Sequence, residues 1–334
     1  MLQLEPQNPL IKESFTTVLD KEYAPISLDR IITDFDFTSY KISTPTSKTT
    51  ILFSISIKCW KDLLNYGVLE LVHSRYSQYP FITIDDRATQ DPGYDLSLIV
   101  DLQAYHQVID SVNVDELIEE LSLLKRNCFA APFLQAFNRY QDLSQNVKID
   151  PNNLYGEDSQ ISSNEQVLKL DYRDAESIYI KPSHDRVTVI FSTIFSDEID
   201  KVFSKVFLQE FSDARKRSIQ KAPQVINSHN EVPLEIKHLV HDPDNKDKVY
   251  ITFVLFPRHL NTEEHKWNSI THIQLFRSYF HYHIKIVKCY LHQRMRFRVN
   301  TFTKILNRAR RDVDEEEMRA ERKTASGRRF EQRV

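Results

Sequence analysis

The feature that most constrains this chain is a stretch of fifty residues, 261–310, that contains neither glycine nor proline. Asn261 or Thr262 can cap a helix at its start, and two glutamates follow where the helix dipole favours negative charge. We therefore predict a single helix from about Thr262 to Arg311. At about 1.5 Å per residue it would be roughly 75 Å long, more than the usual diameter of a globular domain.

One face of this predicted helix is apolar. Its side chains recur in steps of three, four or seven residues, which is the spacing of a single stripe along a helix. The stripe consists of Ile273, Phe280, Ile284, Val287, Leu291, Met295, Phe302, Ile305 and Ala309. Because the helix is longer than its own domain, we expect part of the stripe to be buried against another chain.

The same stretch is strongly basic. No Asp or Glu occurs between His265 and Arg311, whereas eleven lysines and arginines do. The whole chain has 44 basic and 47 acidic residues, so outside this stretch 33 basic residues face 47 acidic ones, a net charge of −14. A basic helix on an acidic body indicates an acidic partner, namely nucleic acid, anionic lipid or protein. A merely solvated face is the plainer alternative, but the length and the apolar stripe favour a binding surface.

Strand and helix patterns alternate through the rest of the chain. Helices are expected at 9–21, 59–77, 114–143 and 196–212, and strands at 30–42, 50–58, 94–102, 167–181, 185–195, 224–228 and 248–256. Each half therefore runs hairpin, helix, strand, helix. This repetition predicts an α+β fold with two related α/β domains, each a mainly antiparallel sheet backed by helices on one face, and a very long C-terminal α-helix.

Local patterns make three further predictions. The hairpin of residues 30–58 should keep one face in water, because serines alternate with its apolar residues. Pro132 should kink the helix that contains it. Ser196 should cap the next helix, whose buried stripe should consist of Ile199, Val202, Phe203, Val206, Phe207 and Phe211.

These patterns suggest five regions. They are an N-terminal α/β domain (1–143), a polar linker or loop (144–166), a second α/β domain (167–260), the long basic helix packing on the second domain and on a partner (261–322), and a tail (323–334). No apolar run reaches the roughly 20 residues of a membrane span, and the first residues lack the basic start of a secretory signal. The three widely spaced cysteines indicate reduced thiols in an intracellular protein.

The sequence offers little for catalysis or cofactor binding. With only four glycines, at 67, 93, 156 and 327, no phosphate-binding loop, dinucleotide fingerprint or nucleophile elbow can form. The cysteines make no C-x-x-C pair, and His281 and His283 would point about 200° apart on a helix. Asp34 and Asp36 are better explained as the polar face of a strand than as paired catalytic carboxylates. We therefore expect no enzyme, no cofactor and no metal site.

Several segments resemble one known family. They are LLKRNCFAAPF (123–133), DRVTVIFSTIF (185–195), KVFLQEF (205–211), APQVINSH (222–229), YITFVLFPRH (250–259), FRSYFHYHIK (276–285), LHQRMR (291–296) and FTKILNRAR (302–310). The family is that of subunit 2, the 34-kDa class, of the actin-related protein 2/3 complex. A looser similarity runs through DFDFTSYKIS (34–43), ILFSISIK (51–58) and YDLSLIVDL (94–102), so the resemblance covers nearly the whole chain in order.

The resemblance implies a non-enzymatic structural subunit of a hetero-oligomer. In this family, subunit 2 pairs with subunit 4 by antiparallel packing of long C-terminal helices. The pair forms the core that holds the two actin-related subunits and contacts the mother filament during branched actin nucleation. The implied location is the cytoplasm, in the cytoskeleton of cortical actin patches. The polar segment 144–166 and Arg311, where a helix-breaking residue is expected, depart from the family's pattern.

Under this resemblance the long helix would serve two partners. Its stripe would pack on subunit 4 through Ile273, Phe280, Ile284, Val287, Leu291, Met295, Phe302 and Ile305. One basic flank would face the actin filament through Arg294, Arg298, Lys304, Arg308 and Arg311. A second basic patch, Arg215, Lys216 and Arg217, is a weaker candidate for the filament contact. Because each exposed charge pair contributes little, several must act together.

Other classes of function compete with this interpretation. A nucleic-acid-binding scaffold would also use the basic helix, but the predicted strands lack exposed aromatic residues and an RNP-type motif. A lipid-binding helix is less well supported, because the charges flank the stripe without leaving a separate membrane-facing half. An enzyme is the least supported class.

Overall fold

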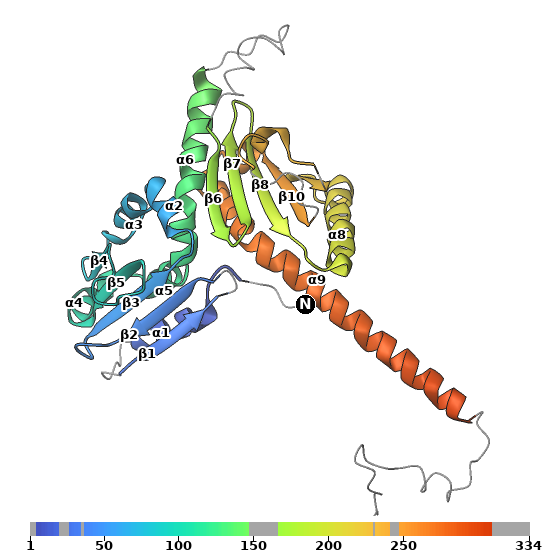
Figure 1. Cartoon of the computed structure of the whole chain (residues 1–334). Helices are drawn as coiled ribbons and strands as arrows, with labels where there is room; N and C mark the ends of the chain where they lie inside the picture. Colours follow the sequence, from blue (N-terminus) through green and yellow to red (C-terminus); the bar gives the residue numbers. More distant parts are fainter. Residues whose placement is uncertain are drawn as a thin grey trace, which may run out of the picture. The chain divides into compact units, whose positions relative to one another are not determined.

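The computed structural model describes residues 5–19, 27–34, 37–146, 166–229, 231–240 and 247–308. Two five-stranded sheets and the long helix α9 (Glu263–Arg308) can be followed in Figure 1. The chain divides into two units, Met1–His281 and Tyr282–Val334, and the boundary falls inside α9. Both sheets belong to the first unit.

The first sheet is antiparallel, with the strand order β1-β2-β3-β5-β4. Its strands are β1 (Asp29–Thr33), β2 (Ser39–Ser43), β3 (Thr50–Ser56), β4 (Ile82–Asp85) and β5 (Leu96–Asp101). The single strand predicted at 30–42 is wrong because the chain reverses within it. Asp34 N donates to Thr38 O at 2.8 Å, and β1 then pairs with β2. Strand β4 is missing from the prediction, since four residues are too few to show a period.

Both faces of this sheet are covered at its centre, which contradicts the predicted solvent-facing side of the hairpin. Leu52 is 2% exposed although it alternates with the core residue Phe53. Ser54 is fully buried, and its hydroxyl lies 2.7 Å from that of Ser97 on the neighbouring strand. Because the two serines hydrogen-bond to each other, they do not need water. Alternating serines therefore do not establish a solvated face.

The helices of the first half are shorter and more numerous than predicted. They are α1 (Pro9–Val18), α2 (Trp60–Asn65), α3 (Val68–Tyr76), α4 (Leu102–Val108), α5 (Val114–Ser122) and α6 (Leu124–Asn146). The helix predicted at 59–77 is split at Gly67, whose φ of 78° glycine adopts without a Cβ clash. The helix predicted at 114–143 divides at Leu123. Pro132 lies inside α6, and the predicted kink stays a prediction.

The second sheet repeats the order of the first, as β6-β7-β8-β10-β9, and all its pairings are antiparallel. Its strands are β6 (Leu168–Arg173), β7 (Glu176–Pro182), β8 (Val187–Ile194), β9 (Gln224–His229) and β10 (Lys248–Leu255). The shared order confirms the predicted α+β fold with two related sheets. Side chains on one face of the second sheet pack around Ile236, namely Tyr179, Ile190 and Tyr250.

Helix α8 (Glu198–Arg217) differs from its prediction in two ways. It is capped by Asp197 and not by Ser196, because the Asp197 carboxylate accepts a hydrogen bond from Ile199 N at 2.9 Å. Three residues of its predicted buried stripe are exposed instead, namely Ile199, Val202 and Val206. Leu208 is the buried apolar residue. Apolar side chains occupy adjacent faces of this helix, so their spacing alone does not identify the covered face.

Several predictions fall on residues outside the described ranges. Helix α6 runs into the predicted linker as far as Asn146, and residues 147–165 are not among those described. The same holds for residues 309–334, which include the predicted tail. The five predicted regional boundaries stay predictions.

Candidate interaction surface

The long helix α9 begins as the sequence predicts. Thr262 caps it, because the Thr262 hydroxyl accepts a hydrogen bond from His265 N at 3.1 Å and Thr262 O accepts one from Lys266 N at 3.0 Å. In the first turn Lys266 Nζ lies 2.6 Å from Glu263 Oε1. The helix then runs to Arg308 over 46 residues, which corresponds to about 69 Å at 1.5 Å per residue.

The first part of α9 is anchored by aromatic packing. Phe276 contacts Phe191 on β8 and Phe253 on β10, with ring centroids 5.4 and 4.6 Å apart. Phe280 is 1% exposed, and its ring centroid lies 6.0 Å from that of Phe195. These contacts bury one side of the helix against the second sheet.

A buried ion pair holds the same part of the helix. Arg277 donates two hydrogen bonds of 3.0 Å to the carboxylate of Glu176 on β7. That carboxylate also accepts hydrogen bonds from Ile194 N at 3.1 Å and from the Tyr172 hydroxyl at 3.2 Å. The Glu176 side chain is 5% exposed and the Arg277 side chain 15%. Each partner therefore replaces the water that the other has lost.

Trp267 joins α9 to helices of the first half. The guanidinium carbon of Arg75 lies 4.2 Å from the Trp267 ring centroid, and that of Arg126 lies 5.0 Å away. Arg75 also donates to both carboxylate oxygens of Glu120, at 2.6 and 2.7 Å. Burial alone would raise the pKa of Glu120. The hydrogen bonds and charge of Arg75, with the charge of Arg126, outweigh burial, and the pKa is lowered.

Beyond these anchors α9 becomes exposed. Three residues of the predicted partner interface, Ile273, Phe280 and Ile284, are at most 4% exposed in the single chain, so a partner cannot reach them. Val287 is half-buried, and every residue of 291–308 is exposed. Only the part of the predicted interface from Val287 onward is therefore available to another chain.

Five side chains of this available part form one row, which we call the apolar row. It consists of Val287, Leu291, Met295, Phe302 and Ile305. Steps of three, four or seven residues keep them on one side of the helix. Met295 is 64% exposed and Phe302 is 61% exposed. Since soluble proteins rarely leave such a row uncovered, it is a candidate surface for a partner helix.

A second row lies beside the apolar row, and four of its six members come one residue before a member of the apolar row. We call it the aromatic–basic row, and it consists of Ile286, Tyr290, Arg294, Phe297, Lys304 and Arg308. One residue corresponds to about 100° of rotation, so the two rows face different directions. Tyr290 is 55% exposed and Phe297 is 70% exposed. The Arg294 guanidinium carbon lies 5.6 Å from the Tyr290 ring centroid, and Arg294 Nη1 donates to the Tyr290 hydroxyl at 3.2 Å.

Sequence reasoning identified the cations of the aromatic–basic row but missed its aromatic members. Tyr290 and Phe297 are seven residues apart, about two turns, and this spacing could have placed them beside Arg294. Arg298, which the sequence analysis grouped with these cations, lies instead between Met295 and Phe302 on the apolar row. Arg311 lies outside the described residues.

The second predicted basic patch lies in the last turn of α8. Arg215 is half-buried, and its Nε donates to Ala222 O at 3.1 Å. Lys216 and Arg217 are exposed, with nitrogen atoms 3.9 and 3.7 Å from the carboxylate of Asp213. The patch is therefore partly neutralised within its own helix.

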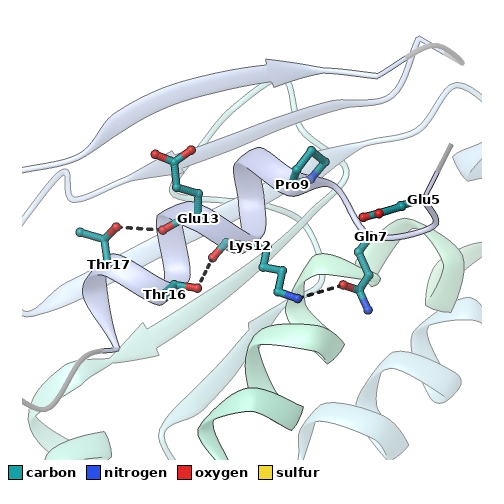
Figure 2. A pocket seen from close by; sticks show the side chains of 7 residues that line it. All are labelled: Glu5, Gln7, Pro9, Lys12, Glu13, Thr16 and Thr17. Atoms are coloured by element: carbon teal, nitrogen blue, oxygen red, sulfur yellow. Dashed lines mark hydrogen bonds between the residues drawn. The ribbon is translucent and has the colours of Figure 1, made fainter. Parts of the chain in front are cut away.

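A hollow on the surface of α1 does not resemble a ligand site. Figure 2 shows its lining, which consists of Glu5, Gln7, Pro9, Lys12, Glu13, Thr16 and Thr17. Lys12 Nζ donates to Gln7 Oε1 at 3.4 Å, and both threonine hydroxyls donate to backbone oxygens of their own helix. Most of the lining is exposed, so the hollow could not shield a ligand from water.

The described ranges contain neither a metal-binding cluster nor a membrane-spanning helix. No three His, Cys, Asp or Glu side chains there are grouped so that they could hold a metal ion. Within the same ranges, no helix combines the length and the apolar character needed to cross a membrane. None of the three cysteines, all of which lie in the described ranges, forms a disulfide; Cys59 and Cys128 are buried and Cys289 is exposed.

A long helix whose second part carries two exposed rows is an arrangement typical of proteins that assemble with other chains. Comparisons with known proteins identify the family. A family model described as "Arp2/3 complex, 34 kD subunit p34-Arc" matches residues 53–313. The chain is 44% identical over 331 residues to "Actin-related protein 2/3 complex subunit 2" of Schizosaccharomyces pombe, across 99% of each chain.

A protein of the same name from Dictyostelium discoideum is 32% identical over 333 residues, which cover 99% of this chain and all of that one. The chain therefore belongs to the family of the 34 kD subunit of the Arp2/3 complex, as the sequence resemblance indicated. It is accordingly a subunit of a protein complex and not an enzyme.

Proposed function

We propose that this chain is a structural, filament-binding subunit of an Arp2/3 complex in the cytoplasmic actin cytoskeleton. Its apolar row packs on the long helix of subunit 4, and its aromatic–basic row faces the side of the mother filament. The pair of subunits forms the core that holds the two actin-related subunits. Family membership supports the place in the complex, and the two exposed rows of α9 carry the division between partners.

The apolar row supports a helix as the first partner. Its members are spaced by three, four or seven residues, which is the pattern that lets two helices pack along their length. The row extends over 19 residues from Val287 to Ile305, about five turns. A contact of this length buries many apolar side chains at once, whereas a compact domain would cover only part of it.

The aromatic–basic row supports an acidic surface as the second partner. Between His265 and Arg308 the helix contains no carboxylate, so the charge of Arg294, Lys304 and Arg308 is not neutralised by their own helix. Tyrosine and arginine are the side chains that most often dominate binding energy at interfaces. Tyr290 and Phe297 give the row an apolar contact that cations alone would lack. The row therefore suits the acidic side of an actin filament.

The test is co-sedimentation with actin filaments of the chain co-expressed with subunit 4, across a series of salt concentrations. The wild-type pair should pellet, and the pelleted fraction should fall as salt rises. An Arg294→Glu, Arg308→Glu double variant should form the pair normally but remain in the supernatant. A Lys285→Glu, Arg296→Glu variant makes the same change of charge on the opposite side of the helix and should pellet like the wild type.

The results distinguish a wrong position of the filament contact from a wrong filament-binding role. If the Arg294→Glu, Arg308→Glu variant pellets as well as the wild type, the filament contact is not on this row. A Lys216→Glu, Arg217→Glu variant then tests the patch at the end of α8. If the wild-type pair stays in the supernatant at every salt concentration, the filament-binding role is wrong.

A further inference from the structure

We infer that Arg298 is a pairing residue, which faces a carboxylate on the partner helix and sets the alignment of the two helices. The inference rests on the proposed pairing of α9 with another long helix. Arg298 then no longer belongs to the cations assigned to the filament, and the partner helix must supply a carboxylate.

The position of Arg298 follows from its spacing. It comes seven residues after Leu291, three after Met295, four before Phe302 and seven before Ile305. Each of these steps keeps a residue on the same side of a helix. Arg298 therefore fills the gap of seven residues between Met295 and Phe302 in the apolar row. A helix that covers the row also covers the stem of Arg298.

The charge of Arg298 requires a partner once it is covered. Its neighbours one turn away along α9 are Arg294, Met295, Thr301 and Phe302, which supply no carboxylate. A guanidinium that loses water without gaining an ion pair is strongly unfavourable, and arginine does not shed its proton. The missing acceptor must therefore come from the other chain. An Asp or Glu fits best, because the guanidinium donates two parallel hydrogen bonds to a carboxylate.

The length of the arginine side chain allows one alternative arrangement. Arginine can lay its stem along an apolar surface while its charged end remains in water. In that case Arg298 would contribute mainly apolar contact, and a leucine would serve at least as well. The two arrangements therefore differ in how the pair responds when the charge alone is removed.

The place of Arg298 within the row gives it a role in alignment. It lies eleven residues from Val287 and seven from Ile305, so it is off the centre of the apolar row. If the partner helix slid by one turn or reversed its direction, its carboxylate would no longer face Arg298. A single polar residue in an apolar seam is a well-attested way to fix register in paired helices.

The test uses the pair co-purified with subunit 4. For each variant, it measures the rate at which unlabelled subunit 4 in the pair is replaced by labelled subunit 4. Arg298→Leu should accelerate dissociation at least tenfold, because it leaves the partner's carboxylate buried without a counter-charge. Arg298→Glu should accelerate it more, by about a hundredfold, because two carboxylates then oppose each other. Arg298→Lys keeps the charge and should fall between Arg298→Leu and the wild type. Arg296→Leu and Arg296→Glu, on another side of the helix, should stay within about twofold of the wild type.

A second experiment exchanges the charges of Arg298 and its partner carboxylate, and it should restore slow dissociation. Each Asp or Glu of the partner's long helix is changed to Lys in turn and combined with Arg298→Glu. Recovery of slow dissociation by one of these combinations, and not by its neighbours, identifies the facing carboxylate. If Arg298→Leu dissociates as slowly as the wild type or more slowly, the inference is wrong although pairing stands. If the wild-type chain co-purifies with no helical partner, the proposed pairing itself fails, and the inference with it.

Discussion

The two parts of α9 share one helical period but have opposite surroundings. In the first part, Phe280 is 1% exposed within an aromatic cluster, whereas Phe302 in the second part is 61% exposed. Both residues belong to the stripe that the sequence predicts for a partner. Regular apolar spacing therefore identifies a helix face but does not say which chain covers it.

The charges of the two parts differ in the same way. In the first part, Arg277 has a carboxylate of its own chain, since Glu176 accepts two of its hydrogen bonds. In the second part, Arg294 and Arg308 have no acidic residue on their own helix between His265 and Arg308. The first set of charges therefore contributes to folding, and the second set is available for binding.

The sharpest test is a matched pair of truncations. Phe280→Ala should lower the free energy of unfolding by about 4 kcal/mol, because it opens a cavity beside Phe195 and Phe276. Phe302→Ala should change it by less than about 0.5 kcal/mol, because the ring is exposed. Urea unfolding followed by tryptophan fluorescence measures both, since Trp267 lies on the anchored part of the helix.

Binding to the partner should respond differently from stability in the Phe302→Ala variant. Phe302→Ala should weaken co-purification with subunit 4 although the chain is as stable as the wild type. A loss of several kcal/mol of stability in Phe302→Ala would show that the apolar row is covered by its own chain. The contrast between the two parts of α9 would then be wrong.

The next effect concerns the buried ion pair. Glu176→Ala should cost about 3 kcal/mol of stability, because it leaves Arg277 without a counter-charge and Ile194 N without an acceptor. Adding Arg277→Met should recover part of that loss, since no unpaired charge then remains buried. The measurement is again urea unfolding, with the exposed Arg296→Met as the control. If the double variant is no more stable than Glu176→Ala alone, the charge of Arg277 is not the source of the cost.

The sequence predicted the general architecture well, because long periodic segments dominate it. The strand at 248–256 and the helix from Thr262 are confirmed, the first by a regular alternation and the second by a cap and fifty residues without glycine or proline. The prediction missed the turn inside 30–42 because the alternation of apolar residues continues across it. The turn is closed by a hydrogen bond from Asp34 N to Thr38 O, and the sequence between these two residues contains no glycine or proline that would have indicated it.

The candidate surface was predicted less completely, for a physical reason. Spacing placed Leu291, Met295, Phe302 and Ile305 on one face, but it could not tell that Ile273, Phe280 and Ile284 are covered by their own chain. Coverage depends on long-range contacts, such as the ring of Phe195 against Phe280, which no local pattern contains. Tyr290 and Phe297 were missed because the prediction considered only the charged residues of the second row, although its aromatic residues have the same spacing.

A smaller effect should appear with pH at the contact between Trp267 and Arg75. The pKa of Glu120 is lowered in the folded protein, so its stabilising effect is present above the unfolded value of 4.5 and is lost as the pH falls through the folded pKa. Glu120→Gln should therefore be less stable than the wild type at pH 7, and the difference should shrink steadily below pH 4.5. Urea midpoints across this range measure it, with Glu116→Gln on the same helix as the exposed control. A difference that stays constant with pH would mean that the Glu120 charge is not involved.

The smallest expected effect is on the one exposed thiol. Cys289 lies about 200° around the helix from Leu291 and about 100° from Tyr290, so it belongs to neither row. Its rate of maleimide labelling should change less than about twofold when the chain pairs with subunit 4. Cys59 and Cys128 are buried, and burial also raises the pKa of the Cys128 thiol, so neither should compete.

A matched thiol on the apolar row makes the labelling result decisive. In a Cys289→Ser background, Leu291→Cys should react quickly in the unpaired chain and at least tenfold more slowly in the pair. Protection at position 291 without protection at 289 would locate the partner on one side of the helix and leave the aromatic–basic row free. Equal protection at both positions would mean that the partner surrounds the helix. A filament could not then contact the aromatic–basic row, and the contrast between two binding faces would have to be abandoned.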